Sequence, residues 1–374
     1  MRSVTAAVSR DDTGTLAFER LTLEAPRPDE VVVEIGFAAI CHTDIKAAHG
    51  EQGSRKPAVF GHEGAGIVVD VGSQVTSVSP GDRVMLTHLS CGTCSSCSGG
   101  DTAYCLNSRS LNMLAGRQDG SSGFYCSDVH SHFFGQSSFA TFSLANARNT
   151  LKVPDDIPLP SAAAMGCGVM TGAGAVFNAL NVQPGSSIVI TGTGAVGLAA
   201  IMAARIAGAA RIVGVDQVQD RLNLARELGA SHVVNASDAD AVEQIREACS
   251  GGARYAVEAS GAPAALTTAL SSLGLHGSCV IVGAAGDVDG TFRWRDLQRR
   301  GITIRGSVIG DAHVQSFLPK LFSFYREGTF PVDRMITYYD FAQINRAMAD
   351  AEAGGPVKPV LRVNGQVEAR SSMN

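Results

Sequence analysis

The sequence predicts an α/β protein of two domains, a β-rich lobe followed by a doubly wound parallel sheet. Its 374 residues exceed what one hydrophobic core usually serves. Before residue 150, short apolar segments are separated by Gly and Pro turns, which is typical of an irregular, barrel-like β lobe. From residue 187 onward, short apolar strands alternate with helical segments, and this alternation predicts a parallel sheet with helices on both faces.

Individual elements follow from the same patterns. In the β-rich lobe we expect strands at residues 31–35, 67–71 and 83–86, and an Ala- and Gly-rich helix follows at 161–182. The strands of the parallel sheet are expected at 187–191, 211–216, 232–234, 255–259, 278–282 and 302–308. Helices are expected at 198–207, 221–228, 241–249 and from 263, and the C-terminal part adds helices at 317–326 and 341–352 and a strand at 359–363.

Composition narrows the class of protein. Hydrophobic residues make up 45% of the chain and charged residues 17%, which is an ordinary globular balance. The net charge of −5 argues against nucleic acid or an anionic membrane as the main partner. The first 20 residues lack the apolar core of a signal peptide, and we expect no apolar run of membrane length. We therefore expect a cytoplasmic protein, in which clustered cysteines are metal ligands more often than disulfides.

Four of the nine cysteines lie close together in the chain, with the spacing Cys-x2-Cys-x2-Cys-x7-Cys. Thiolates crowd in this way around a zinc ion, in an iron–sulfur cluster or in disulfides. Tetrahedral zinc takes four sulfurs, and the short spacings let one loop surround the ion. A site filled by four thiolates leaves no position for a substrate, so we expect a scaffold site formed by Cys91, Cys94, Cys97 and Cys105.

A glycine-rich turn predicts a dinucleotide site. The sequence Gly-x-Gly-x-x-Gly at residues 192–197 follows a predicted strand and opens a predicted helix. Such a turn brings backbone amides and the helix N-terminus to a pyrophosphate. Asp216 lies nineteen residues after Gly197, where a carboxylate accepts hydrogen bonds from ribose hydroxyls and repels a 2′-phosphate, so we predict NAD rather than NADP. The predicted cofactor-binding residues are Gly192, Gly194, Ala195, Val196, Gly197, Asp216 and Arg221.

Cys41, His62 and Cys167 form a second candidate metal set outside the four-cysteine loop. Two cysteines and a histidine would leave the fourth position of zinc open for water or substrate, as a catalytic zinc requires. Each residue alone is also compatible with an ordinary structural role, and spacing does not show that the three converge.

The order of these motifs resembles that of the zinc-dependent alcohol dehydrogenases of the medium-chain dehydrogenase/reductase superfamily. The resemblance extends over residues 5–364. It rests on the segments 41–44, 61–66, 91–105, 166–168 and 192–197. Residues 133–142 and 165–174 look like the aryl-alcohol (benzyl alcohol) dehydrogenase branch, which includes enzymes for allylic alcohols such as geraniol. The resemblance implies a GroES-like catalytic domain at 1–168 and 309–374, and a Rossmann NAD-binding domain at 169–308.

The resemblance also implies residue roles. Cys41, His62 and Cys167 would bind a catalytic zinc, and the four-cysteine loop would bind a structural one, giving two Zn²⁺ ions per chain. Glu63 would lie behind the catalytic zinc, and Asp44 would orient the His62 ring. Thr43 would contact the substrate oxygen in a proton relay, which in this chain would end at Lys46, His49 or water. The remaining implied contacts are His42 to the cofactor pyrophosphate, and Thr87, Phe133 and Phe134 to the substrate.

The implied reaction is NAD-dependent oxidation of an aromatic or allylic primary alcohol to its aldehyde (EC 1.1.1). Zinc would lower the pKa of the alcohol, and hydride would pass to NAD. The alternatives are a glutathione- or mycothiol-linked formaldehyde dehydrogenase and a non-catalytic protein that binds NAD and zinc. The last predicted strand of the parallel sheet resembles an edge that pairs across a two-fold axis, which implies a homodimer or homotetramer.

Overall fold

The structure, a computed structural model, describes residues 1–284 and 288–367. The chain divides into two compact units. Unit 1 comprises Met1–Cys167, His313–Phe322 and the chain from Val332, and unit 2 comprises Gly168–Ala312 and Ser323–Pro331. The domain bounds implied by the resemblance change at residues 168 and 309, whereas the units change after Cys167 and Ala312, and unit 2 also includes Ser323–Pro331.

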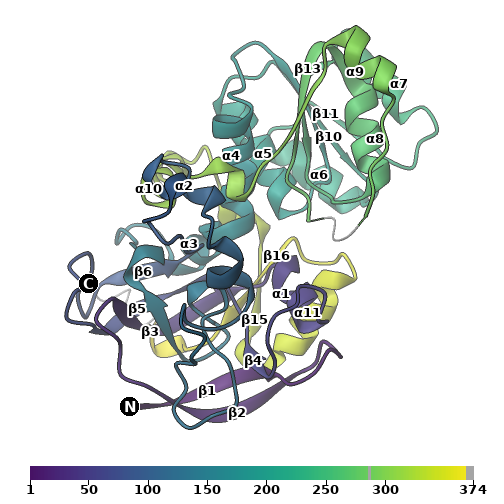
Figure 1. The fold of residues 1–374 in the computed structure, drawn as a ribbon. Coiled ribbons are helices and arrows are strands. Elements are labelled where there is room, and N and C mark those ends of the chain that lie inside the picture. Colours follow the sequence, from purple (N-terminus) through teal and green to yellow (C-terminus); the bar gives the residue numbers. More distant parts are fainter. Residues whose placement is uncertain (285–287, 368–374) are drawn as a thin grey trace. The chain divides into compact units, whose positions relative to one another are not determined.

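Unit 1 contains two sheets (Figure 1). The larger has seven strands, in the order β15-β16-β3-β5-β6-β8 with β7 also paired to β3, and the smaller has the order β2-β1-β4. Strand β3 is buried along its whole length, which explains its nearly continuous apolar sequence. The strands are β1 (Arg2–Ser9), β2 (Leu16–Leu23), β3 (Glu30–Ala39), β4 (Ala58–Val59), β5 (Gly64–Val71), β6 (Arg83–Leu86), β7 (Phe142–Asn146), β8 (Thr150–Lys152), β15 (Ile336–Asp340) and β16 (Lys358–Arg362).

Residues of both sheets and of the helices at 42–48 and 344–352 form the apolar core of unit 1. The predicted strands at 31–35, 67–71 and 83–86 are confirmed as β3, β5 and β6. The strand predicted at 359–363 is confirmed as β16. The α-helices that begin in this unit are α1 (His42–Ala48), α2 (Ser95–Ser98), α3 (Leu159–Ala164), α10 (Val314–Arg326) and α11 (Ile344–Glu352).

Unit 2 is built on a six-stranded parallel sheet in the order β11-β10-β9-β12-β13-β14. Strand order reverses between β9 and β12, and ligands bind at such switch points beyond the carboxyl ends of the strands. Helix α5 packs against α6, and α7 packs against α8. The elements are α4 (Met170–Gly174), β9 (Ser187–Thr191), α5 (Ala195–Ile206), β10 (Arg211–Asp216), α6 (Gln219–Leu228), β11 (His232–Asn235), α7 (Ala241–Ala248), β12 (Ala253–Glu258), α8 (Pro263–Ser272), β13 (Leu273–Ile281), α9 (Trp294–Arg300) and β14 (Thr303–Gly306).

The predicted α/β class with a β-rich domain and a doubly wound parallel sheet is therefore confirmed. One expectation was wrong. The helical run Leu159–Ala179 has 21 residues and is apolar enough to cross a membrane by length and composition, although the sequence analysis expected no such run. Its most apolar window is 94% buried inside the protein, which is typical of a core helix.

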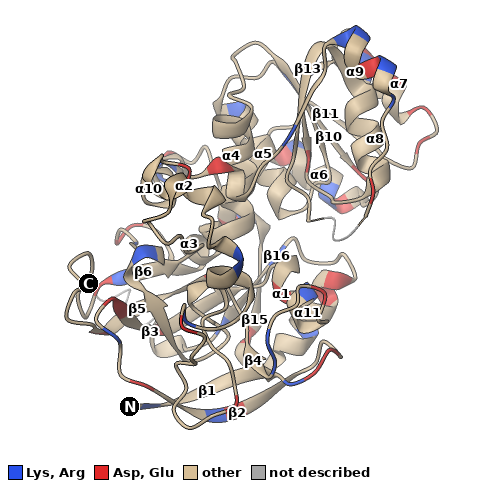
Figure 2. Ribbon diagram, viewed as in Figure 1, with Lys and Arg blue, Asp and Glu red and all other residues tan. Residues whose placement is uncertain are grey.

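Charged positions of both signs are interspersed on the elements of both units (Figure 2). Helix α9, for example, carries Asp296 in its first turn and Arg299 and Arg300 in its last turn. This arrangement places negative charge at the start of the helix dipole and positive charge at its end, which stabilises the helix.

Candidate functional site

The four-cysteine loop lies around α2 in unit 1, and the structure brings all four sulfurs within 4.8 Å of one another. The Sγ atoms of Cys91 and Cys97 are 3.9 Å apart, and those of Cys94 and Cys105 are 4.0 Å apart. Two sulfurs at 2.3 Å from one ion in a tetrahedral arrangement lie about 3.8 Å apart. The cysteines are free of disulfides, so their geometry fits a tetrahedral zinc site.

Backbone amides around this loop point at the sulfurs. The N–H groups of Thr93 and Cys94 donate to Cys91 Sγ, and these bonds lower the pKa of Cys91 to about 5. Leu106 N–H donates to Cys94 Sγ. Burial raises the pKa of Cys97 to about 12, so a bound cation is needed to hold all four sulfurs as thiolates.

A second ligand set also converges within unit 1. One ligand atom each from Cys41, His62, Glu63 and Cys167 lies within 4.8 Å of the others. Cys41 caps the N-terminus of α1, His62 and Glu63 directly precede β5, and Cys167 lies in the helical run that follows α3. The structure therefore brings together the three residues whose convergence the spacing in the sequence could not establish.

Asp44 fixes the geometry of this second set. Its buried carboxylate accepts hydrogen bonds from His62 Nδ1 at 2.7 Å, Cys41 N–H at 3.0 Å and Gly61 N–H at 3.1 Å. A proton on Nδ1 leaves the lone pair on His62 Nε2, and that atom has no hydrogen-bond partner among the residues that the structure describes. A buried nitrogen without a partner, beside two thiols, fits a metal ligand.

The electrostatics of the second ligand set reflect its burial and the charges packed together in it. A hydrogen bond from Cys167 lowers the pKa of Cys41, while that bond and burial raise the pKa of Cys167. Burial lowers the pKa of His62, but Asp44 and then Cys41 raise it well above its ordinary value, so a metal on Nε2 would displace a proton from the imidazole. Thiolate, imidazole and an adjacent carboxylate are donors that zinc accepts.

The glycine-rich turn joins β9 to α5 in unit 2. Gly192 has φ +88°, and a Cβ on Gly197 would lie 1.8 Å from the Gly192 carbonyl oxygen, so both positions require glycine. A Cβ on Gly194 would meet no atom within 4 Å among the described residues, so this backbone position is open to a ligand. The open position at the start of α5 is where a pyrophosphate would bind.

Asp216 ends β10 and faces the glycine-rich turn. Its Oδ2 accepts from the N–H of Thr193 at 2.7 Å and from its hydroxyl at 3.0 Å, and its Oδ1 accepts from Gln217 and Val218 N–H. The structure thus brings the predicted carboxylate to the turn. Arg221 lies on α6, the helix that follows Asp216. Ala195 and Val196 lie in the first turn of α5, directly after the glycine-rich turn.

Comparison with known proteins identifies the family. Residues 27–155 match the alcohol dehydrogenase GroES-like domain, and residues 195–325 match the zinc-binding dehydrogenase domain. The geraniol dehydrogenase of Castellaniella defragrans is 41% identical over 364 residues, covering 96% of this chain and 97% of that protein. The chain belongs to the zinc-binding alcohol dehydrogenases.

Two further relatives extend the comparison. The crystal structure of benzyl alcohol dehydrogenase from Acinetobacter calcoaceticus has a TM-score of 0.94 and 38% identity, covering 97% of this chain and 100% of that one. The S-(hydroxymethyl)glutathione dehydrogenase of Saccharomyces cerevisiae is 32% identical over 371 residues, covering 96% of this chain and 95% of that protein. The chain therefore matches these dehydrogenases over nearly its full length.

Sequence reasoning about this zinc-binding alcohol dehydrogenase left out Lys358, which lies at the second ligand set. Its side chain is 2% exposed, and its ammonium pairs with the Glu63 carboxylate and lies 3.4 Å from the Ile40 carbonyl oxygen. Burial raises the pKa of Glu63 although Lys358 opposes that shift. The available signal was a lysine directly before the apolar residues 359–361 in a strand, β16, that is buried except at its last residue.

The other predicted residues of the dehydrogenase site lie on α1 and in two loops. Thr43 Oγ1 is 3.9 Å from Cys41 Sγ, and His42 is exposed at the first position of α1. The hydroxyl of Thr87 is fully buried and donates to the Gly166 carbonyl oxygen at 2.6 Å, next to Cys167. The structure therefore gives Thr87 a structural contact beside a candidate ligand.

The rings of Phe133 and Phe134 lie against His62. Phe134 stacks on the imidazole with 4.4 Å between ring centroids and an interplanar angle of 27°, and Phe133 meets it edge-on at 5.9 Å. Both phenylalanines are at least 95% buried, and Phe133 also packs on Phe60. An aromatic wall thus contacts the histidine of the second ligand set.

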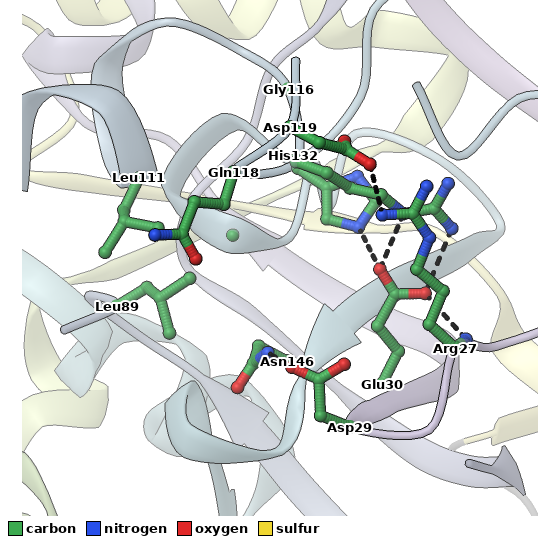
Figure 3. A pocket seen from close by; sticks show the side chains of 12 residues that line it. Arg27, Asp29, Glu30, Leu89, Leu111, Gly116, Gln118, Asp119, His132 and Asn146 are labelled. Carbon is green, nitrogen blue, oxygen red and sulfur yellow. Dashed lines mark hydrogen bonds and ion pairs between the residues drawn. The ribbon is translucent and has the colours of Figure 1, made fainter. Parts of the chain in front are cut away.

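A cavity of about 440 Å³ in unit 1 is lined in part by His132 and Gly135, which flank Phe133 and Phe134 in the chain (Figure 3). The Glu30 carboxylate points into the group of side chains that lines it, and accepts from Arg117 Nε at 2.7 Å and Arg117 Nη2 at 3.0 Å. His132 Nε2 lies 3.1 Å from the same carboxylate. Burial raises the pKa of Glu30, but the bonds from His132 and Arg117 outweigh burial and lower it to about 2.

Proposed function

We propose that this dehydrogenase oxidises aromatic or allylic primary alcohols to aldehydes, with NAD as the hydride acceptor. The observation that carries the proposal is the convergence of Cys41, His62 and Cys167, with the ring of Phe134 stacked on the His62 imidazole. The similarity to dehydrogenases named for geraniol and for benzyl alcohol supports the same class of substrate.

Cys41, His62 and Cys167 would hold the catalytic metal. When bound there, zinc supplies a Lewis acid that lowers the pKa of an alcohol. Asp44 keeps the proton of His62 on Nδ1 and so directs Nε2 to the metal. Glu63 is held by Lys358 beside these ligands, where its carboxylate balances the charge of the site.

The proton of the alcohol needs a path to solvent. Thr43 Oγ1 is the hydroxyl nearest to the Cys41 ligand along α1, and we propose that it accepts this proton and passes it on. One helical turn later, Lys46 is half-buried, and the half-buried His49 lies 3.7 Å from Glu352. Either side chain, or a water molecule, would complete the relay.

The glycine-rich turn and Asp216 would bind the dinucleotide. The open backbone at Gly194 suits the pyrophosphate, and the carboxylate at the end of β10 suits ribose hydroxyls. A 2′-phosphate would meet the negative charge of Asp216, which favours NAD over NADP. His42 and Arg221 would add contacts to the phosphates and the ribose.

The aromatic wall favours a substrate with a flat, apolar group next to the reacting carbon. The ring of Phe134 would contact the flat group of a benzylic or allylic substrate, and Phe133, which is fully buried, would support that ring. Ethanol is too small to bury comparable apolar area, so we expect it to be a poor substrate.

A second candidate function is thiol-linked oxidation of formaldehyde, which the similarity to the yeast S-(hydroxymethyl)glutathione dehydrogenase supports. Oxidation of formaldehyde only with an added thiol would favour it. A protein that binds NAD and zinc without catalysis would reduce NAD with none of the substrates.

The experiment that tests the proposal is a substrate panel. Zinc-replete protein is assayed with benzyl alcohol, geraniol, ethanol and formaldehyde, the last with and without glutathione, using NAD and NADP. We expect the highest kcat/KM for benzyl alcohol or geraniol with NAD, and two zinc ions per chain by metal analysis. Equal activity with ethanol would contradict the substrate class, and one zinc per chain would contradict one of the two metal assignments.

We also propose that the enzyme is a cytoplasmic homodimer or homotetramer. Strand β14 is the edge of the six-stranded sheet, as the sequence analysis expected, and an edge strand can pair with a second copy. Light scattering on purified protein would give the mass of the assembly, and a monomer would contradict the proposal.

A further inference from the structure

The loop that carries the aromatic wall has an unusual backbone. His132, Phe134 and Ser137 have φ values of 63°, 53° and 66°, in the left-handed region that residues with a Cβ seldom adopt. Three such residues fall within six positions, next to the second ligand set. Conformations of this kind persist only where surrounding interactions enforce them, and they concentrate at functional sites.

The side chain of Gln136 supplies part of that enforcement. It is 1% exposed, and its Oε1 accepts from Gly64 N–H at 3.1 Å. Its Nε2 donates to the His62 carbonyl oxygen at 2.8 Å and to the Thr87 carbonyl oxygen at 3.3 Å. The amide therefore forms hydrogen bonds with the backbone on both sides of Glu63, as a neighbouring strand would.

Further buried contacts fix the rest of the loop. Asn149 Nδ2 donates to the carbonyl oxygens of Phe134 at 3.0 Å and Thr87 at 3.1 Å. Ser137 Oγ donates to the Val59 carbonyl oxygen at 2.6 Å, and His132 contacts Glu30 at the start of the loop. These contacts hold the loop on both sides of Gln136.

The ring contacts and the amide contacts meet at the same residue. Phe134 stacks on the imidazole of His62, while Gln136 binds the carbonyl of His62. A shift of the amide would therefore move the backbone of the histidine and the wall that lies on its ring. Thr87, the third partner of Gln136, donates to Gly166 beside Cys167 and so extends the contacts to a second candidate ligand.

We propose that Gln136 is a positioning residue that holds the His62 ligand segment and the Phe133–Phe134 wall in one fixed arrangement. The inference rests on the proposed function for the substrate side, but its metal side requires only that His62 binds zinc. Gln136 makes no contact with zinc or substrate itself; it sets the geometry of the groups that do. Sequence reasoning did not single it out, because one glutamine in a polar loop carries no local signal.

The test replaces Gln136 with methionine, which has similar length and no hydrogen-bonding amide. The rate of zinc release to a chelator is measured on the zinc-replete enzyme. Each zinc site contributes one kinetic phase, and the phase that changes in Cys97→Ser belongs to the zinc of the four-cysteine loop. Removal of groups that orient metal ligands costs about 10–100-fold in metal affinity, and such losses lie mostly in the dissociation rate, so we expect Gln136→Met to accelerate release from the His62 site about 10–100-fold. We also expect the KM for benzyl alcohol to rise by about tenfold relative to that for ethanol, with a smaller change in kcat.

Asn112→Leu is the matched control. Asn112 is also 1% exposed, and its amide makes three bonds of 2.9 Å, with Leu89 N–H, the Leu89 carbonyl and the Ser108 carbonyl. Its loss should lower the melting temperature and accelerate release of the loop zinc, while release from the His62 site and the KM ratio stay at wild-type values. A general loss of stability would instead move both variants alike.

A lower melting temperature in Gln136→Met, with zinc release and the KM ratio unchanged, would overturn the inference. If the methionine variant does not fold, Gln136→Asn replaces it; its amide is one methylene shorter, so we expect zinc release between the wild-type and tenfold-accelerated rates. An unchanged rate in that variant would equally overturn the inference. Failure of the wild-type enzyme to oxidise any alcohol would contradict the proposed function, while the zinc-release result would still decide the role of Gln136.

Discussion

Asp44→Asn perturbs the second ligand set without changing any proposed ligand. In the wild-type protein, Asp44 Oδ1 accepts from His62 Nδ1 and Gly61 N–H, and Oδ2 accepts from Cys41 N–H. Asparagine can keep only one oxygen, so its NH₂ group would face one of these donors. The residue is fully buried, and water cannot replace the lost acceptor.

The magnitude follows from these contacts. An unsatisfied buried donor costs about 1–3 kcal/mol. Loss of a carboxylate that orients a metal-binding histidine costs about 10–100-fold in metal affinity, which corresponds to about 1.4–2.8 kcal/mol. We therefore expect Asp44→Asn to bind the zinc of the His62 site about 10–100-fold more weakly, while the four-cysteine loop keeps its zinc.

Competition with a chromophoric zinc chelator measures this affinity. Asp70→Asn is the control. Asp70 is an exposed aspartate on β5, and its carboxylate accepts a hydrogen bond from the N–H of the adjacent Val71. Zinc affinity of Asp44→Asn within twofold of the control would refute the argument that Asp44 directs His62 to a metal.

Three further predictions concern the cofactor, the proton path and acid stability. Asp216→Ser should raise the KM for NAD by about tenfold and shift the ratio of kcat/KM values towards NADP; an unchanged ratio in steady-state assays would contradict the role of the carboxylate. Thr43→Ala should lose most turnover while metal analysis still finds two zinc ions, and near-normal activity would contradict the relay. Because the pKa of Glu30 is lowered to about 2 in the folded protein, its contribution to stability is present above the unfolded pKa of 4.5 and is lost as pH falls towards 2. Urea unfolding between pH 6 and about 3 should therefore show a smaller loss of stability for Glu30→Gln than for the wild type, and parallel losses would contradict this.

The sequence predicted unit 2 more completely than unit 1. The strands of unit 2 are short apolar runs separated by helices, and each predicted strand from 187–191 to 302–308 overlaps an observed one. In unit 1, the pairing of β4 with β1 and of β16 with β3 joins segments far apart in the chain, and no local pattern specifies such pairs.

The metal sites show the same contrast. The four-cysteine loop is local, so its spacing alone indicated a site for a tetrahedral ion. Cys41, His62 and Cys167 are separated by long stretches of chain, and only the resemblance to a family suggested that they converge. Lys358 matches a phosphate-contacting position of the family only loosely and was therefore left out of the predicted site, and Gln136 was not singled out. The partners of both lie in distant segments of the chain.

Anomalous X-ray scattering at the zinc edge from crystals of the zinc-replete enzyme tests the central claim most directly. The account predicts two peaks per chain, one within bonding distance of Cys41, His62 and Cys167 and one among Cys91, Cys94, Cys97 and Cys105. A zinc-replete crystal with no peak among Cys41, His62 and Cys167 would contradict it.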